Sequence, residues 1–282
     1  MKKFSLVLLL LIFVLVSVTG CSSKPKEEAA KIEYTKAEDL KGKSVGTIVW
    51  FGVTDDVLLS MFSGAYKTEF KEVKSFESEA ALIMALDTGK VDAAWLRDFQ
   101  AGAYAKNIEK YSSFSGEADK MVAGSARMVA AVGSPAAEEL GKINAALLEL
   151  KEDGTLAQLQ KEYIEEFDFT KNYESVQMPI IEGAPTYKVS ISGSMVPLDY
   201  IAADGNPTGF SIALLAKIAE KANINFELVT VGFGTDRMEL TSNKIDYIFC
   251  YTLTDDNMTK ETEIIFSEPY FTYEGSSFLV KK

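Results

Sequence analysis

Two polar side chains stand at the step from a predicted strand to a predicted helix, where open α/β sheets bind their ligands. Thr54 follows a β-rich run that ends near residue 49, and Asp98 follows the run 91–96. The Thr54 hydroxyl and the N–H groups near it suit a ligand carboxylate. Each residue could instead cap the helix that follows it. Both roles, ligand binding and helix capping, remain open for these two residues.

The composition excludes most catalytic arrangements. The chain has 282 residues and no histidine, which removes hydrolases with a histidine base and every histidine-ligated metal site. Its 29 basic and 41 acidic side chains give a formal net charge of −12, which repels the phosphates of nucleic acids. Most familiar catalytic arrangements are therefore excluded, and we expect no cofactor, no metal ion and no nucleic-acid partner.

The N-terminal segment predicts export and a lipid anchor. Two lysines precede an apolar run at 6–16, which is shorter than the roughly 20 apolar residues that span a bilayer. Residues 18–21 (VTGC) resemble the bacterial lipobox, in which Cys21 is lipidated and becomes the mature N-terminus after 1–20 is removed. Residues 21–38 are then a flexible tether at the outer face of the cell membrane. An ordinary signal peptide with an accidental cysteine is the alternative.

Short β-rich runs alternate with longer helical patterns along the rest of the chain, which predicts parallel α/β sheets. The segments 86–92 (LDTGKVD) and 240–246 (LTSNKID) share the spacing of a helix end that leads into a strand. This repeated step favours two domains. The runs 91–95 and 245–251 are apolar almost throughout, which indicates central strands covered by helices on both faces.

Residues 134–164 form the clearest helical stretch, because a serine and a proline begin it and apolar residues follow at helical spacing. The segment 165–187 contains prolines and a glycine and predicts a linker. Cys250 lies within an apolar run, which indicates a small core side chain.

Several short motifs lie along the chain in an unusual order: LKGKSVG at 40–46, GVT at 52–54, KEDGTL at 151–156, TGF at 208–210, ID at 245–246 and FSEPY at 266–270. Together they resemble motifs of the extracytoplasmic solute-binding proteins of family 3, the receptors of polar amino acid ABC transporters. The resemblance implies an α/β, two-lobed periplasmic-binding-protein-like fold of type II, with the ligand cleft between the lobes.

The order of these motifs predicts a circularly permuted chain, because the family begins with the motifs that come last here. Residues 39–128 are then the family's second lobe. Residues 129–282 hold the family's C-terminal helices, the linker 165–187 that joins the usual termini, and the first lobe. Only the stretch near 126–132 is expected to cross between the lobes. Two unrelated receptor fragments fused end to end are the competing interpretation.

The resemblance also implies a ligand site shared by the two lobes. Asp98 corresponds to the family aspartate that holds the ligand's α-ammonium group, and Thr252 and Thr254 correspond to hydroxyl positions after a strand. Asn257 stands where the family has an arginine that grips the α-carboxylate. Lys260 could replace this arginine as a point charge. The remaining cleft candidates are a thioether and three aromatic side chains, which could equally be core residues: Met195, Tyr200, Trp50 and Trp95.

These features predict a lipid-anchored receptor that captures a small polar, amino-acid-like solute by lobe closure and presents it to an ABC permease. A sensor or adaptor that reports its ligand to another partner is the second hypothesis, because the arginine is missing and the motif order is altered. A dehydratase is the third, since a few proteins that resemble this family use carboxylate acid/base chemistry.

Overall fold

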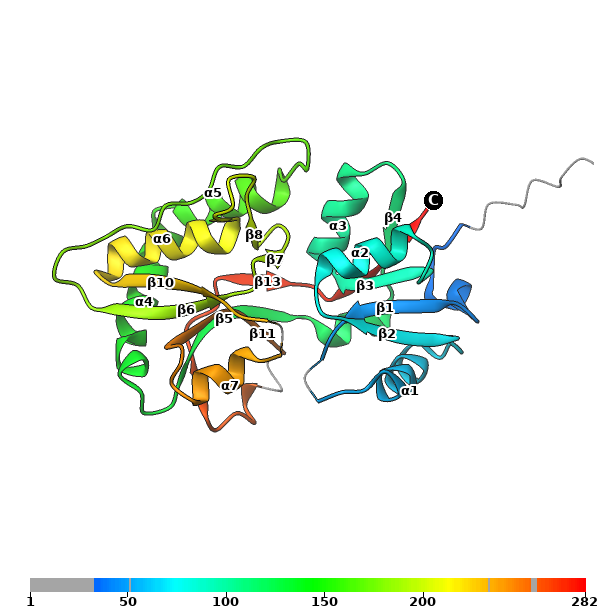
Figure 1. Ribbon diagram of the computed structural model, residues 1–282, viewed down its shortest axis with the longest axis horizontal. Coiled ribbons are helices and arrows are strands. Elements are labelled where there is room, and N and C mark those ends of the chain that lie inside the picture. Colours follow the sequence, from blue (N-terminus) through cyan, green and yellow to red (C-terminus); the bar gives the residue numbers. More distant parts are fainter. Residues whose placement is uncertain (1–32, 51, 233, 255–257) are drawn as a thin grey trace, which may run out of the picture. The chain divides into compact units, whose positions relative to one another are not determined.

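Two large β-sheets with helices on their faces, together with one small sheet, make up the described chain (Figure 1). The computed structural model describes residues 33–50, 52–232, 234–254 and 258–282. The predicted signal peptide and the predicted lipidation of Cys21 lie outside these ranges. Within them, no helix is both long enough and apolar enough to cross a membrane.

The leading lobe is built on a five-stranded sheet in the order β2-β1-β3-β14-β4. Its strands are β1 (Ser44–Ile48), β2 (Glu72–Phe76), β3 (Ala93–Arg97), β4 (Tyr111–Phe114) and β14 (Ser276–Lys281). Its helices are η1 (Ala37–Leu40), α1 (Asp55–Tyr66), α2 (Glu79–Asp87), α3 (Asp98–Asn107) and η2 (Glu117–Val122). Strand β3 alternates its side chains between two cores, because Trp95 packs with α1 and Leu96 packs with α2 and α3. Helices therefore cover both faces of a central strand, as the apolar run predicted.

The trailing lobe is built on a larger sheet in the order β10-β6-β11-β5-β12, with β13 also paired to β5. Its strands are β5 (Gly124–Ala131), β6 (Thr186–Ile191), β10 (Asn225–Thr230), β11 (Tyr247–Leu253), β12 (Ile264–Phe266) and β13 (Phe271–Tyr273). A small sheet lies beside it, formed by β7 (Ser194–Met195), β8 (Asp199–Ile201) and β9 (Pro207–Thr208). The helices are α4 (Pro135–Glu152), α5 (Thr155–Gln160), the π-helical turn η3 (Lys161–Glu165), α6 (Phe210–Ala222) and α7 (Asp236–Thr241).

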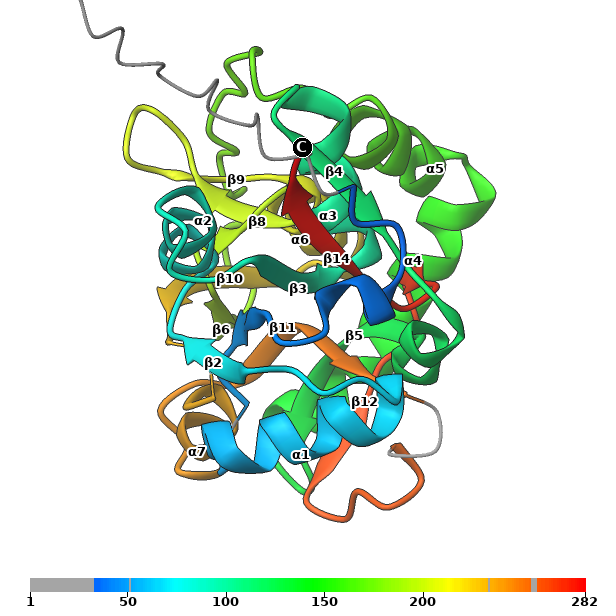
Figure 2. The same ribbon diagram turned by 90° about the vertical axis from the view of Figure 1, so that its right-hand side faces the viewer.

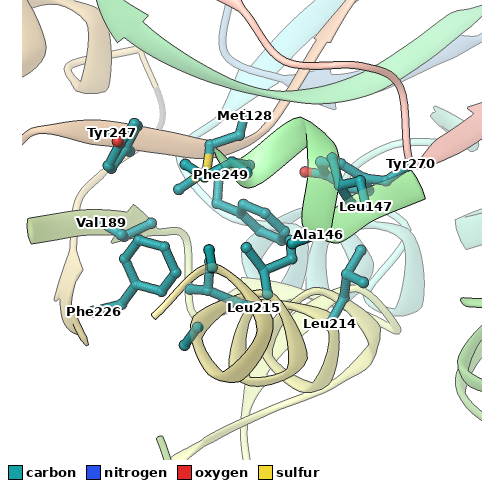
Figure 3. Packing of buried hydrophobic residues seen from close by; sticks show 14 of the residues in the cluster. Met128, Ala146, Leu147, Val189, Leu214, Leu215, Phe226, Tyr247, Phe249 and Tyr270 are labelled. Carbon is teal, nitrogen blue, oxygen red and sulfur yellow. The ribbon is translucent and has the colours of Figure 1, made fainter. Parts of the chain in front are cut away.

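The core of the trailing lobe forms where α4 and α6 pack on the sheet (Figure 3). Helix α4 begins as predicted, with the Ser134 hydroxyl accepting from the Ala137 N–H at 3.2 Å and Pro135 in the first turn. Its buried face, which includes Leu147, meets Leu215 of α6 and Met128 of β5. Each such side chain, fully buried, contributes about 1.5–3 kcal/mol. The core therefore fixes the strand ends that carry the site.

The two sheets repeat one strand order and one set of directions. Strand β1 is parallel to its neighbours β2 and β3, and β6 is parallel to its neighbours β10 and β11. The fourth strand along each sheet is antiparallel and comes from the other half of the chain: β14 in the leading lobe and β5 in the trailing lobe. The similar segments 86–92 and 240–246 lead into β3 and β11, which hold equivalent positions. The internal similarity thus marks two copies of one topology.

Two segments cross between the lobes, one before β5 and one between β13 and β14. The expected single crossing is wrong, and so is the assignment of all residues after 128 to the trailing lobe. The reason is the apolar strand β14, whose Phe278, Leu279 and Val280 are at most 1% exposed and fill the gap between β3 and β4. Tyr34 and Leu40 pack in the same core as Phe278, so the start of the described chain lies beside its last strand (Figure 2).

Candidate functional site

A pocket of about 210 Å³ opens where the carboxyl ends of β1 and β3 face β7 and β11. We call it the cleft pocket. Residues of the leading lobe make most of its wall, and the trailing lobe contributes two: Thr47, Ile48, Val49, Trp50, Trp95, Leu96, Arg97, Phe99, Gln100, Met195 and Thr252. The cleft pocket thus lies at strand ends, as expected for a ligand site in an α/β protein.

Four of the side chains proposed from the sequence meet in the cleft pocket. Trp50 and Trp95 come from the leading lobe, and Met195 and Thr252 come from the trailing lobe. The two indole rings pack at a centroid distance of 5.7 Å. Sequence spacing alone gives no such proximity, because Trp50 follows β1 and Trp95 lies within β3.

Asp98 does not line the cleft pocket but ties the start of α3 to the second crossing. Its carboxylate accepts from the N–H groups of Phe99 and Glu274, each at 2.8 Å. Its own N–H donates to the Gly275 carbonyl at 3.3 Å. Burial raises the pKa of this carboxyl, and the two N–H donors oppose the shift. The carboxylate is thus placed for a structural contact with the crossing.

The remaining proposed residues lie apart from the pocket lining. Thr54 is exposed, and its hydroxyl makes no capping bond to α1. Tyr200 packs on Phe167 at 6.1 Å, and burial raises its pKa. Thr254 and the exposed Lys260 follow β11. Asn257 lies outside the described residues.

Sequence reasoning missed three polar residues of the cleft pocket. Arg97 ends β3, and Gln100 lies one turn into α3, beside the predicted Asp98. Thr47 lies in β1 and is 1% exposed. The signal for Arg97 was the strand end itself, because a side chain there can face the cleft as readily as the residue that follows. Gln100 and Thr47 carry no comparable signal in one sequence.

A hydrogen-bond network fixes the aromatic wall of the cleft pocket. The indole N–H of Trp95 lies 2.6 Å from the Tyr66 hydroxyl oxygen and 3.1 Å from Oδ1 of Asp119. Asp119 is 2% exposed and also accepts from Ser276 of β14 at 2.7 Å. Because every polar atom here has a partner, the ring of Trp95 is held in one orientation.

Two buried acids lie behind the cleft pocket, one on each lobe. Glu79 of α2 is 2% exposed and accepts from the Gln100 side chain and from the Tyr104 hydroxyl, the latter at 2.8 Å. Burial raises its pKa to about 8, and the charge of Asp199 acts in the same direction. Asp199 of β8 accepts from the Gly193 N–H at 2.6 Å, and burial raises its pKa to about 6. Each lobe therefore holds a buried carboxyl group whose surroundings disfavour the charged form.

The arrangement suits non-covalent binding. Among the described residues there is no group of three or more side chains that could hold a metal ion. The lining of the cleft pocket includes an indole pair, a phenyl ring, a thioether, two hydroxyls, an amide and one guanidinium. Such a mixture of apolar walls and a few polar groups is typical of small-molecule sites.

Residues 187–282 match the family of bacterial extracellular solute-binding proteins, family 3. This match begins in β6 and includes the motifs TGF, ID and FSEPY. The resemblance is therefore confirmed for this part of the chain, and the family is one of binding proteins. A search of curated proteins finds no match.

The solved structures that match this chain share little sequence with it. The ligand-binding component of an ABC-type import system from Staphylococcus aureus is 11% identical with a TM-score of 0.41, and the alignment covers 86% of this chain but only 66% of that one. An ancestral arginine-binding protein bound to arginine is 15% identical, with a TM-score of 0.41 and 86% of both chains covered. A putative L-cystine ABC transporter from Listeria monocytogenes is 14% identical, with a TM-score of 0.43 and 86% and 83% covered. The two-lobed α/β fold expected from the sequence is present in the strand order itself.

Proposed function

We propose that this protein is the substrate-binding lipoprotein of an ABC uptake transporter and that it captures a small polar, amino-acid-like solute by closure of its lobes. The observation that supports this most directly is the cleft pocket, which both lobes line in a chain whose residues 187–282 match a solute-binding family. The two crossings near residues 123 and 274 provide a hinge around which the lobes can close.

A ligand screen tests this function. A solute that binds only the folded protein at about 100 times its Kd should raise the free energy of unfolding by roughly 2.7 kcal/mol. For a folded unit of this size we expect an increase in Tm of roughly 5–10 °C, measured by thermal shift on protein that lacks residues 1–20. Met195→Asp is the matched variant, because it places a charge in the cleft pocket and should abolish the response. No response to any amino acid, amine or small peptide would exclude the proposed function.

We also propose that the mature protein is anchored by lipid on Cys21. The support is the lipobox-like ending of the leader and the polar segment that follows it. Cys21→Ser should move the protein from the membrane fraction to the soluble fraction, and should abolish incorporation of radiolabelled palmitate. Cys250→Ser is the control, because that thiol is buried in the trailing lobe. Unchanged membrane association of Cys21→Ser would contradict the anchor.

Circular permutation of the family's motif order is part of the proposal. The first-lobe motifs lie within 187–282, and the second-lobe motifs at 40–46 and 52–54 precede them. The packing of Tyr34 and Leu40 against the core of β14 supports it, because a continuous chain could join these points in an unpermuted relative. Each lobe has one large sheet, and no lobe is present twice among the described residues, which favours a permuted chain over a fusion of two receptor fragments.

A further inference from the structure

The cleft pocket has a single formal charge among the residues that line it, and that charge is positive. Arg97 is the only charged side chain in this lining, within the part of the chain that the structure describes. The neighbouring Asp98 uses its carboxylate oxygens on the N–H groups of Phe99 and Glu274. Arg97 is thus the one source of formal charge in the described lining of the cleft pocket.

The side chain of Arg97 reaches from the leading lobe to the trailing lobe. Its guanidinium carbon lies 4.7 Å from the ring centroid of Tyr273 in β13, and one N–H group donates to the Val122 carbonyl at 3.3 Å. Burial raises the pKa of Cys250 in β11 to about 12, and the charge of Arg97 opposes that shift. Met195 and Thr252 of the trailing lobe complete the lining to which Arg97 belongs.

The guanidinium is held in place and still has donors to offer. The ring contact with Tyr273 and the bond to Val122 fix its plane, which lowers the entropy that a ligand contact would cost. A guanidinium has five N–H donors, and the hydrogen bonds found among the described residues use one of them. Two parallel donors of this kind match the two oxygens of a carboxylate.

The rest of the lining suits an apolar body attached to that carboxylate. Trp50, Trp95 and Phe99 present aromatic surface, and Met195 presents a flexible thioether from the other lobe. Trp95 is only 7% exposed and is fixed by its bonds to Tyr66 and Asp119, so the wall is rigid. A volume of about 210 Å³ suits a molecule of amino-acid size.

We propose that Arg97 anchors the ligand's carboxylate and that the cleft pocket selects small monocarboxylates with an apolar body. This inference rests on the proposed function and names its substrate class. It places the carboxylate contact at Arg97, where β3 ends, and not at Asn257, where the family resemblance implies it. Both α-amino acids and acids without the amino group satisfy this chemistry, and the test below separates them.

Calorimetry with two matched series of compounds tests the inference. Each series keeps one apolar body: L-leucine, 4-methylpentanoate and 3-methylbutylamine in the first, and L-phenylalanine, 3-phenylpropionate and 2-phenylethylamine in the second. We expect at least one acid to bind and its amine counterpart to bind at least tenfold more weakly. An amine that binds as tightly as its acid overturns the inference, and this comparison needs no variant.

Variants of Arg97 locate the contact. Arg97→Gln should weaken acid binding roughly 10- to 100-fold, because one charge-assisted pair is lost, and Arg97→Lys should give an intermediate loss. Lys120→Gln is the control, because this exposed cation lies near the crossing but outside the cleft pocket. Unchanged affinity of a folded Arg97→Gln protein overturns the inference.

The two levels of the proposal fail in different ways. If neither acid series binds while another solute stabilises the protein in the thermal screen, the carboxylate assignment is wrong and the solute-binding function stands. If no solute of any class binds, both are wrong. Far-ultraviolet circular dichroism of each Arg97 variant establishes that it is folded before its affinity is compared.

Discussion

A Gly275→Ala variant is expected to lose about 4 kcal/mol or more of its folding free energy, because a methyl group at this position meets main chain on a buried crossing. Gly275 has φ +149°, and an added Cβ would lie 2.3 Å from the Asp119 carbonyl oxygen and 2.8 Å from its carbonyl carbon. Asp119 cannot move aside easily, because its carboxylate accepts from Ser276 at 2.7 Å and from the Gly116 N–H at 2.8 Å. Thermal unfolding followed by circular dichroism should show Tm lowered by roughly 10 °C.

Gly133→Ala is the matched control for this experiment. Gly133 also has positive φ, +76°, but an added Cβ would meet nothing within 4 Å. It should therefore cost only the backbone strain of a left-handed alanine, about 1 kcal/mol. Equal losses in the two variants would show that the clash at the crossing is absent.

Glu79→Gln is expected to remove most of the pH dependence of stability between pH 6 and pH 8. Glu79 has an ordinary pKa of 4.5 when unfolded and a pKa of about 8 in the folded protein, because burial disfavours its charge. Between these values the folded state holds a proton that the unfolded state releases, so the free energy of unfolding falls as pH rises. The stabilising contribution is complete below pH 4.5 and is lost as pH approaches 8. It amounts to roughly 5 kcal/mol at most, at about 1.4 kcal/mol per pH unit.

Urea unfolding at pH 5, 6.5 and 8 measures this effect. Asp199 has a folded pKa of about 6 and contributes a loss of the same sign below that pH, which remains in the Glu79→Gln variant. The chain has no histidine, so no imidazole titrates in this window. Glu77→Gln, an exposed acid two residues away, is the control and should follow the wild-type curve. A Glu79→Gln protein that loses stability with pH as steeply as the wild type would contradict the assignment.

The elements were predictable where the signal is local. The serine–proline start and apolar spacing of α4 depend on residues within one turn or one face of a helix, so Ser134 and Leu147 could be placed from the sequence. The apolar run of β3 likewise indicated a strand covered on both faces. The sheet to which β14 belongs could not be predicted, because its partners β3 and β4 are distant in sequence. No local pattern within Ser276–Lys281 indicates which strands it pairs with.

The site was predictable only in part, for a similar reason. The family resemblance proposed Thr252, and Trp95 was one of the aromatic candidates; both lie in the lining of the cleft pocket. The strand-end rule did not distinguish Arg97 from Asp98, because that choice depends on the crossing that supplies Glu274 as a partner for Asp98. Because β14 was assigned to the wrong lobe, the crossing that leads into it was not expected. The charged residue of the site was therefore expected at Asp98, whereas Arg97 lines the cleft pocket.

The place of β14 between β3 and β4 also affects how the polypeptide is completed during synthesis. A ribosome releases β1 through β4 early, but the slot between β3 and β4 stays open until the residues from Ser276 onward have emerged. Until then, the edges of β3 and β4 that pair with β14 are exposed, and such edges can pair with other chains. The leading sheet is therefore complete only once Ser276–Lys281 has paired with β3 and β4.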